Sequence, residues 1–138
     1  MTWVVDASIA VKWVIPEVWS DKADRLRATE DRMLAPDLLL VEVANALWQK
    51  TGREEIAPAE ADQALDLVTD SGIDLRPTTP LLSRAMQVAR RLNHPVYDCV
   101  YLALAERERA SLVTADRRLL RTVAQRRLPI AVVDLRAV

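Results

Sequence analysis

Residues 96–107, VYDCVYLALAER, form a nearly continuous apolar stretch that sets the expected fold. They follow residues 93–95 (NHP), a polar segment whose proline suits the first position of a helix. From 96 to 105 every residue except Asp98 is apolar or aromatic, which predicts a helix buried on all sides. The rest of the chain is therefore expected to pack around this helix.

Asp98 is the one charged residue among these apolar positions, and its charge needs compensation. A bare carboxylate is costly to bury, and no Lys or Arg lies within one helical turn of Asp98. One explanation is the helix N-terminus, since a first-turn acid gains roughly 0.3–1 kcal/mol from the helix dipole. The other is a cation that Asp98 binds together with other acids, and Asp98 alone does not decide between them.

The composition is that of a single globular domain covering residues 1–138. Hydrophobic residues make up 51% and charged residues 28% of the chain, which separates it from disordered sequences. The formal net charge is −1 and the isoelectric point about 5.9, so the overall basic charge of many nucleic-acid-binding proteins is missing. Any contact with nucleic acid is therefore expected from a local basic patch.

The chain lacks the features of several other classes of protein. With only 2 glycines it has no glycine-rich phosphate loop. Its single cysteine, Cys99, excludes an intrachain disulfide and a cysteine-rich zinc site, and is predicted to be a small core residue. No apolar run reaches membrane-spanning length, and no basic segment precedes the first apolar stretch. The prediction is a cytoplasmic protein without a membrane span.

Apolar strands and helical segments alternate along the chain. Strands are expected at 3–5, 32–35, 73–76, 111–115 and 130–133. Helices are expected at 9–14, 18–29, 37–50, 58–69, 80–92, 96–107 and 117–127, with Gly52 closing the third. This order predicts an α/β fold whose parallel sheet is covered on both faces and connected by right-handed crossovers.

Four of the 20 acidic residues stand in apolar surroundings. Asp6 and Asp116 each follow an apolar strand, and each is also placed to cap the next helix. Glu42 and Asp98 each interrupt an apolar helix. If the first and fourth strands are neighbours, Asp6 and Asp116 meet at the carboxyl edge of the sheet, where open α/β sheets bind their ligands.

A polar stripe accompanies Glu42 on its helix. Asn45 and Gln49 follow at i+3 and i+7, so the three side chains share one face. That face is either solvated or part of a site, and the scarcity of other polar residues on this helix favours a site. Asp134 ends the last strand but precedes only a terminal tail, so it is not expected to take part.

Converging carboxylates without histidine or thiol partners suit a hard divalent cation, Mg²⁺ or Mn²⁺, and such an ion fits phosphodiester hydrolysis. A Ser–His–Asp site is not expected, because the only histidine, His94, lies in a polar loop where a turn or cap role is favoured. A two-carboxylate glycosidase would leave two of the four acids unexplained. A phosphoacceptor domain would need a lysine after a late strand, whereas the lysines stand at 12, 22 and 50.

The four acids lie in four short motifs, which are DAS at 6–8, VEVANAL at 41–47, YDCVYLALAE at 97–106 and TAD at 114–116. Together they resemble the PIN-domain ribonucleases, and most of all the toxins of VapBC toxin–antitoxin systems. The resemblance spans the whole chain and implies a PIN-like three-layer α/β/α fold with a five-stranded parallel sheet in the order 3-2-1-4-5. It also implies a homodimer, endoribonuclease activity that depends on Mg²⁺ or Mn²⁺, and a cognate antitoxin that covers the groove.

Carried over to this sequence, the resemblance assigns the catalytic, metal-holding role to Asp6, Glu42, Asp98 and Asp116. Thr114 and Ser8 are expected to supply supporting hydroxyl oxygens. Asn45, one turn from Glu42, is expected to orient the Glu42 carboxylate without binding the metal itself. A phosphate-binding rim for RNA is expected from Lys12, Lys50, Arg53, Arg117 and Arg118. Arg90 and Arg91, at a helix end, are interpreted as partners of the helix dipole instead. The alternative function is a PIN-like module that binds RNA or protein without cleaving it.

Overall fold

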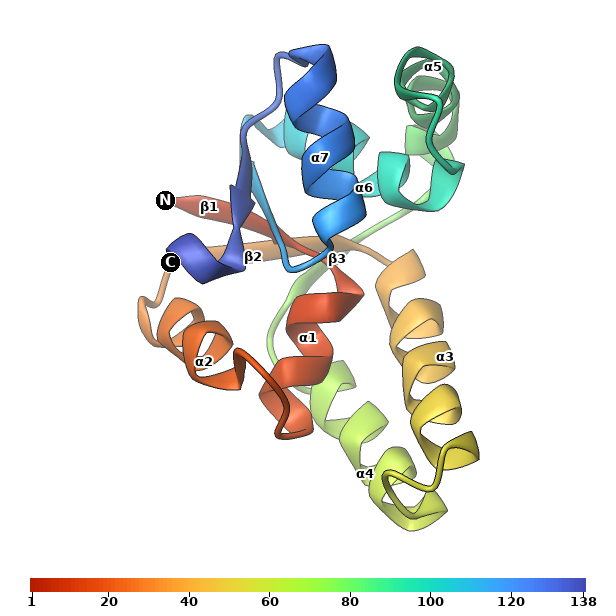
Figure 1. Cartoon of the computed structure of the whole chain (residues 1–138). Coiled ribbons are helices and arrows are strands. Elements are labelled where there is room, and N and C mark those ends of the chain that lie inside the picture. Colours follow the sequence, from red (N-terminus) through yellow and green to blue (C-terminus); the bar gives the residue numbers. More distant parts are fainter.

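A computed structural model describes all residues, 1–138, and shows a five-stranded sheet at the centre of the protein (Figure 1). All strand pairs are parallel and the spatial order is β3-β2-β1-β4-β5, as predicted. The strands are β1 (Thr2–Val5), β2 (Arg32–Pro36), β3 (Asp74–Arg76), β4 (Ser111–Thr114) and β5 (Val132–Asp134). Because β1 and β4 are neighbours with Val5 opposite Val113, the residues that follow these strands come together at the carboxyl edge.

Helices cover both faces of the sheet, which confirms the three-layer α/β/α architecture. In Figure 1, α5, α6 and α7 lie above the sheet and the other four helices lie below it, where α3 and α4 form a helical hairpin. The helices are α1 (Ala7–Val14), α2 (Ser20–Ala28), α3 (Leu38–Gly52), α4 (Pro58–Thr69), α5 (Leu82–Leu92), α6 (Val96–Glu108) and α7 (Arg117–Arg126). None of them is both long and apolar enough to cross a bilayer.

The α6 helix is the buried helix that its sequence predicts. Every residue from Cys99 to Ala105 is buried, and the helix packs on β1, β2 and β4. The apolar strand residues of β1 and β4 complete the same continuous core. Apolar burial on this scale is the main stabilising term for a small α/β domain, so the packing of α6 on the sheet is a principal source of its stability.

The structure differs from the prediction at several element ends. The α3 helix runs through Gly52, because the Arg53 N–H still donates to the Gln49 carbonyl, and the left-handed residue is Glu54 with φ of 58°. The last strand begins two residues later than predicted. Asp134 ends this strand and caps a short 3-10 helix, Leu135–Ala137, where no helix was expected.

Candidate functional site

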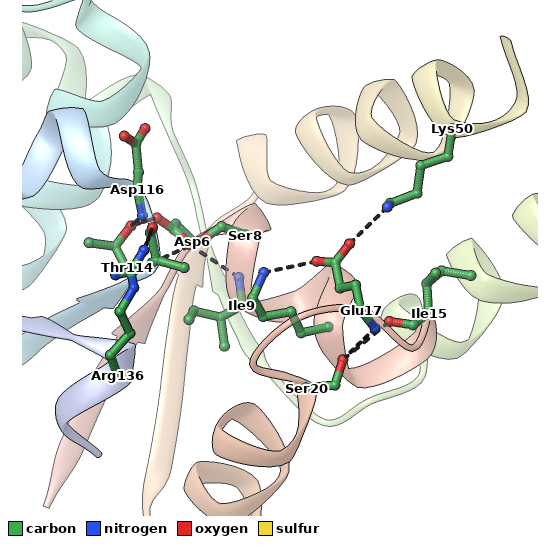
Figure 2. Close-up of polar contacts among 12 residues, drawn as sticks. Asp6, Ser8, Ile9, Ile15, Glu17, Ser20, Lys50, Thr114, Asp116 and Arg136 are labelled. Atoms are coloured by element: carbon green, nitrogen blue, oxygen red, sulfur yellow. Dashed lines mark hydrogen bonds and ion pairs between the residues drawn. The ribbon is translucent and has the colours of Figure 1, made fainter. Parts of the chain in front are cut away.

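Asp6 lies at the carboxyl end of β1 and is the centre of a buried hydrogen-bond network (Figure 2). Ser8 Oγ donates to Asp6 Oδ1 at 2.5 Å, and Thr114 Oγ1, from the end of β4, donates to Asp6 Oδ2. Both hydroxyls also accept backbone N–H groups, Ser8 from Ala115 and Thr114 from Asp116, each at 3.1 Å. The two strand ends, and with them Asp6 and Asp116, are therefore joined through two hydroxyl groups.

The Asp6 carboxylate is buried without a positive partner. It is 7% exposed and forms no ion pair. Burial raises the pKa of Asp6 to about 6, although hydrogen bonds from Ser8, Thr114 and the Ile9 N–H oppose the increase. The charge of Asp98 raises this pKa further. Asp6 is thus an electrostatically costly group that a bound cation would stabilise.

Glu42 is half-buried on α3, close enough to Asp98 for the two charges to interact. Burial raises the pKa of Glu42, and repulsion from Asp98 adds to the increase, while the nearby Tyr101 hydroxyl lowers it. That hydroxyl is buried and makes no hydrogen bond of normal geometry. Burial raises the pKa of Tyr101 far above its usual range, and the charges of Glu42, Asp6 and Asp98 raise it further. Three of the four acids therefore lie within electrostatic range of one buried phenol.

Asp98 has a local partner that the sequence interpretation missed. His94 Nε2 lies 2.5 Å from Asp98 Oδ2, and the His94 side chain is only 2% exposed. The expected cap role holds for the backbone of His94, whose N–H donates to the Ala89 carbonyl at 3.1 Å at the end of α5. The expectation missed the ring, which contacts the Asp98 carboxylate directly. The available signal was spacing, because His94 stands four residues before Asp98, just ahead of the N-cap of α6.

Asp6 and Asp116 both cap a helix, and this role is compatible with a role in the site. Asp6 Oδ1 accepts the Ile9 N–H at 3.3 Å, which makes Asp6 the N-cap of α1. Asp116 Oδ1 accepts the N–H groups of Arg118 and Leu119 at 2.9 and 3.2 Å, which makes it the N-cap of α7. Asp116 Oδ2 makes no hydrogen bond within the protein, so capping leaves one oxygen of this carboxylate free.

The polar stripe on α3 lines a cavity. Glu42, Asn45 and Gln49 face a space of about 420 Å³, together with the exposed ring of Tyr97. The other lining side chains are small or aliphatic, from Ala7, Leu38, Val41 and Ala46. No hydrogen bond joins Asn45 to Glu42, so support of the carboxylate by Asn45 stays a prediction. The stripe thus belongs to a hollow that a ligand can enter beside Glu42.

The donor chemistry of the site fits a hard divalent cation. Every candidate ligand is a carboxylate or hydroxyl oxygen, which Mg²⁺ and Mn²⁺ prefer. No positively charged side chain pairs with the buried Asp6 carboxylate. However, no three His, Cys, Asp or Glu side chains are arranged so that they could hold one ion. Asp6, Glu42 and Asp98 interact through their charges, whereas Asp116 is connected through Thr114. Simultaneous coordination therefore requires side chains to turn toward a common point.

Two of the five predicted RNA-binding residues form ion pairs with one carboxylate. Lys50 Nζ lies 2.8 Å from one carboxylate oxygen of Glu17 (Figure 2). Lys12 Nζ lies 2.9 Å from the other. The expectation that these lysines are free to bind phosphate is therefore corrected: they link α1 and α3 through Glu17. The remaining three predicted residues are exposed and form no ion pair, namely Arg53, Arg117 and Arg118.

Comparison with known proteins gives consistent similarities over most of the chain. Residues 3–125 match the PIN domain family. Ribonuclease VapC3 of Pyrobaculum aerophilum is 32% identical over 121 residues, covering 86% of this chain and 92% of the relative. Ribonuclease VapC9 of Mycobacterium tuberculosis is 33% identical over 130 residues, covering 94% and 97%.

Solved structures share the fold. The crystal structure of PAE2754 from Pyrobaculum aerophilum superposes with a TM-score of 0.73 at 26% identity, covering 99% of this chain and 91% of that one. VapBC2 from Rickettsia felis, bound to a DNA fragment from its promoter, gives a TM-score of 0.63 at 14% identity, covering 97% and 98%. The second similarity concerns the fold alone.

Proposed function

This chain belongs to the PIN domain family, and we propose that it is a metal-dependent endoribonuclease that hydrolyses RNA phosphodiester bonds. The observation that carries the proposal is the unpaired, buried Asp6 with the charge of Asp98 close to it, and Asp98 in turn close to the charge of Glu42. Relatives named VapC ribonucleases, at 32% and 33% identity over most of the chain, support the same activity.

In this proposal the four acids Asp6, Glu42, Asp98 and Asp116 hold Mg²⁺ or Mn²⁺. When bound, such an ion supplies Lewis acidity to the phosphodiester and to the attacking water. The ion also removes an obstacle to binding, because a cluster of uncompensated carboxylates repels the RNA backbone. The site is thus expected to be idle without metal.

Neighbouring residues hold these acids in place. Ser8 and Thr114 each donate to one oxygen of Asp6, which fixes the plane of its carboxylate. His94 contacts Oδ2 of Asp98 and leaves Oδ1 as the oxygen available to a ligand. Tyr101 keeps its proton, because burial and the nearby carboxylates raise the pKa of its hydroxyl. Its hydroxyl therefore stays neutral and adds no further negative charge to the cluster.

We also propose that the protein is the toxin of a VapBC-type pair, neutralised by a cognate antitoxin, and that it forms a homodimer. The motif resemblance supports both assignments, and the VapC relatives support the family within the PIN domains. Several large apolar side chains are exposed on the helices, which suits association: Val41, Trp48, Leu67, Leu82 and Met86. Sedimentation at micromolar concentration should show a dimer; a monomer would contradict the dimer assignment.

A cleavage assay with purified protein and labelled RNA tests the proposed activity. The wild type should cleave with Mn²⁺ and stop when a chelator is added. Asp98→Asn should abolish cleavage while circular dichroism shows a folded protein, because the substitution removes charge and little volume. The matched control is Asp66→Asn, the same chemical change at an exposed position of α4, which should cleave like wild type.

Two results would decide against this function. Full activity of Asp98→Asn, with contaminating nuclease excluded, would remove the acid cluster from the reaction. A wild type that binds RNA but cleaves none with either ion would favour the alternative, a PIN-like module that binds RNA without cutting it.

A further inference from the structure

A second hollow is lined by residues of α5, of the segment that leads into α6 and of α7. Its volume is about 520 Å³. We call it the Arg90–Arg118 groove, and its lining consists of Met86, Ala89, Arg90, Asn93, His94, Pro95, Val96 and Arg118. Arg118 is one of the predicted phosphate-binding residues, whereas Arg90 was interpreted as a partner of the helix dipole. The two arginines are 28 positions apart and meet only through the packing of α5 against α7, so their pairing could not be predicted from sequence.

The groove is basic and its charge is not compensated. Arg90 and Arg118 are exposed and form no ion pair, and no acidic residue lines the groove. Four other arginines of this protein are bound to carboxylates: Arg32 and Arg76 to Asp74, Arg84 to Glu106, and Arg136 to Asp134. In a chain with a net charge of −1, two free guanidinium groups facing one hollow form a local anion-binding feature.

Two of the residues that line the groove also contact acids of the cluster. His94 lines it and lies 2.5 Å from Asp98 Oδ2. Arg118 also lines the groove, and its backbone N–H donates to Asp116 Oδ1 at 2.9 Å. A chain whose scissile phosphate sits at the acids therefore has a neighbouring phosphate within reach of the groove.

We propose that the Arg90–Arg118 groove binds a backbone phosphate of the RNA adjacent to the cleaved one; this inference rests on the proposed function. Guanidinium groups bind phosphate oxygens through paired N–H donors. No exposed aromatic ring lines the groove, so it offers no stacking surface for a base. The groove accordingly positions the RNA without reading its sequence.

RNA binding at several salt concentrations tests the groove. The wild type is kept in chelator, where the proposed function predicts no cleavage, and fluorescence anisotropy reports binding of short oligouridylate and oligoadenylate. Arg90→Gln/Arg118→Gln should bind both about tenfold more weakly at low salt, as expected for two ion pairs. Its salt dependence should be shallower by about 1.4 in log–log slope, because each single-strand phosphate that a cation neutralises adds roughly 0.7 to the slope.

The chain offers a matched control in Arg91→Gln/Arg126→Gln. These arginines lie on the same two helices as the groove pair, are also exposed, and do not line the groove. The control should keep the wild-type slope and stay within about twofold in affinity. A control that binds as weakly as the groove variant would overturn the inference, because the effect would then be one of general charge.

Other outcomes separate this inference from the proposed function. If the wild type cleaves RNA with Mn²⁺ but the groove variant keeps the wild-type affinity and slope, the inference alone is overturned. If the wild type cleaves nothing but the groove variant still shows weaker binding and a shallower slope, the phosphate site stands and the nuclease proposal fails. An effect confined to one of the two oligonucleotides would contradict backbone recognition.

Discussion

Asp6 links the acid cluster to the stability of the metal-free protein. Its pKa is raised from 3.8 to about 6 in the folded state, chiefly by burial, so the native state binds this proton more tightly than the unfolded chain. The resulting stability is fully present below about 4 and is lost as pH rises through about 6. The difference between the folded and unfolded pKa values of Asp6 corresponds to at most about 3 kcal/mol in the free energy of unfolding.

Replacing Asp6 by Asn removes this titration. In chelator, the free energy of unfolding of Asp6→Asn relative to wild type should increase as pH rises from about 4 to about 7, and then level off. Urea unfolding of both proteins across this range measures the difference. A difference that does not change with pH would mean that Asp6 is not the buried, uncompensated acid described above.

His94 is expected to act on the site through Asp98. His94→Ala removes the partner of Asp98 Oδ2 and frees the carboxylate to rotate. Removing such a supporting partner typically weakens metal affinity or activity 10–100-fold, and His94→Gln, which keeps a polar group, should recover part of it. Calorimetric titration with Mn²⁺ reports the affinity independently of cleavage. Wild-type Mn²⁺ affinity in a folded His94→Ala protein would rule out the positioning role.

The candidate acids could be predicted from sequence, but their partners could not. Asp6, Glu42 and Asp98 were identifiable because each interrupts or ends an apolar segment, where an unpaired charge is costly. The pairing with His94 was missed because a histidine in a polar loop has many possible partners until the loop is packed. The ion pairs of Lys12 and Lys50 with Glu17 could likewise not be predicted, because they form only when α1 and α3 pack together.

The α7 helix begins at a residue with two functions that mutations can separate. Asp116→Asn keeps an oxygen that caps the helix, so the melting temperature should change little, whereas Asp116→Ala should cost about 1 kcal/mol. Both should abolish RNA cleavage, because both remove the carboxylate charge. Thermal melts and the cleavage assay on the same preparations test this; an Asp116→Asn protein with full activity would leave capping as the only role.

Glu17 connects α1 to α3 and is expected to be structural only. Burial raises the pKa of Glu17, but the hydrogen bonds and charges of Lys50 and Lys12 outweigh it, so the pKa lies below its usual range. Its contribution is present above about 4.5 and is lost as pH falls through the lowered folded value.

Glu17→Gln should therefore destabilise the protein by about 1–2 kcal/mol at neutral pH, since two lysines lose a charged acceptor. Urea unfolding at neutral and at acidic pH should show the difference shrinking as the pH falls. Cleavage should be unchanged once the protein is folded. A large decrease in the activity of the folded variant would return Lys12 and Lys50 to the functional site.

Elements with strong local signals were predicted well, and those set by long-range packing were not. The buried pattern of α6 and the caps at Asp6 and Asp116 are local, and the structure has them. The prediction that α3 ends before Gly52 was wrong. The helix includes Gly52, and the N–H of Arg53, the next residue, still donates to the Gln49 carbonyl. The last strand begins later than predicted because its pairing with β4, rather than its own apolar run, decides which residues are extended.

At the scale of the whole molecule, the strand order brings distant residues to one edge of the sheet. Asp6 and Thr114 are 108 positions apart yet share a hydrogen bond, because β1 and β4 are neighbours. Alternation of elements predicts a parallel sheet, whereas the order 3-2-1-4-5 came from the motif resemblance. Periodicity alone does not determine which strands pair, so the convergence of the acids could not be derived from spacing.

The central claim is that Asp6, Glu42, Asp98 and Asp116 act as one divalent-cation site. The most direct measurement is the free energy of unfolding of wild type, Asp98→Asn and the exposed control Asp66→Asn, each in chelator and in Mn²⁺. Wild type and Asp66→Asn should gain about 2.7 kcal/mol when free Mn²⁺ is a hundredfold above its dissociation constant, and Asp98→Asn should gain much less. A wild type whose stability does not respond to Mn²⁺ at any concentration would contradict the claim.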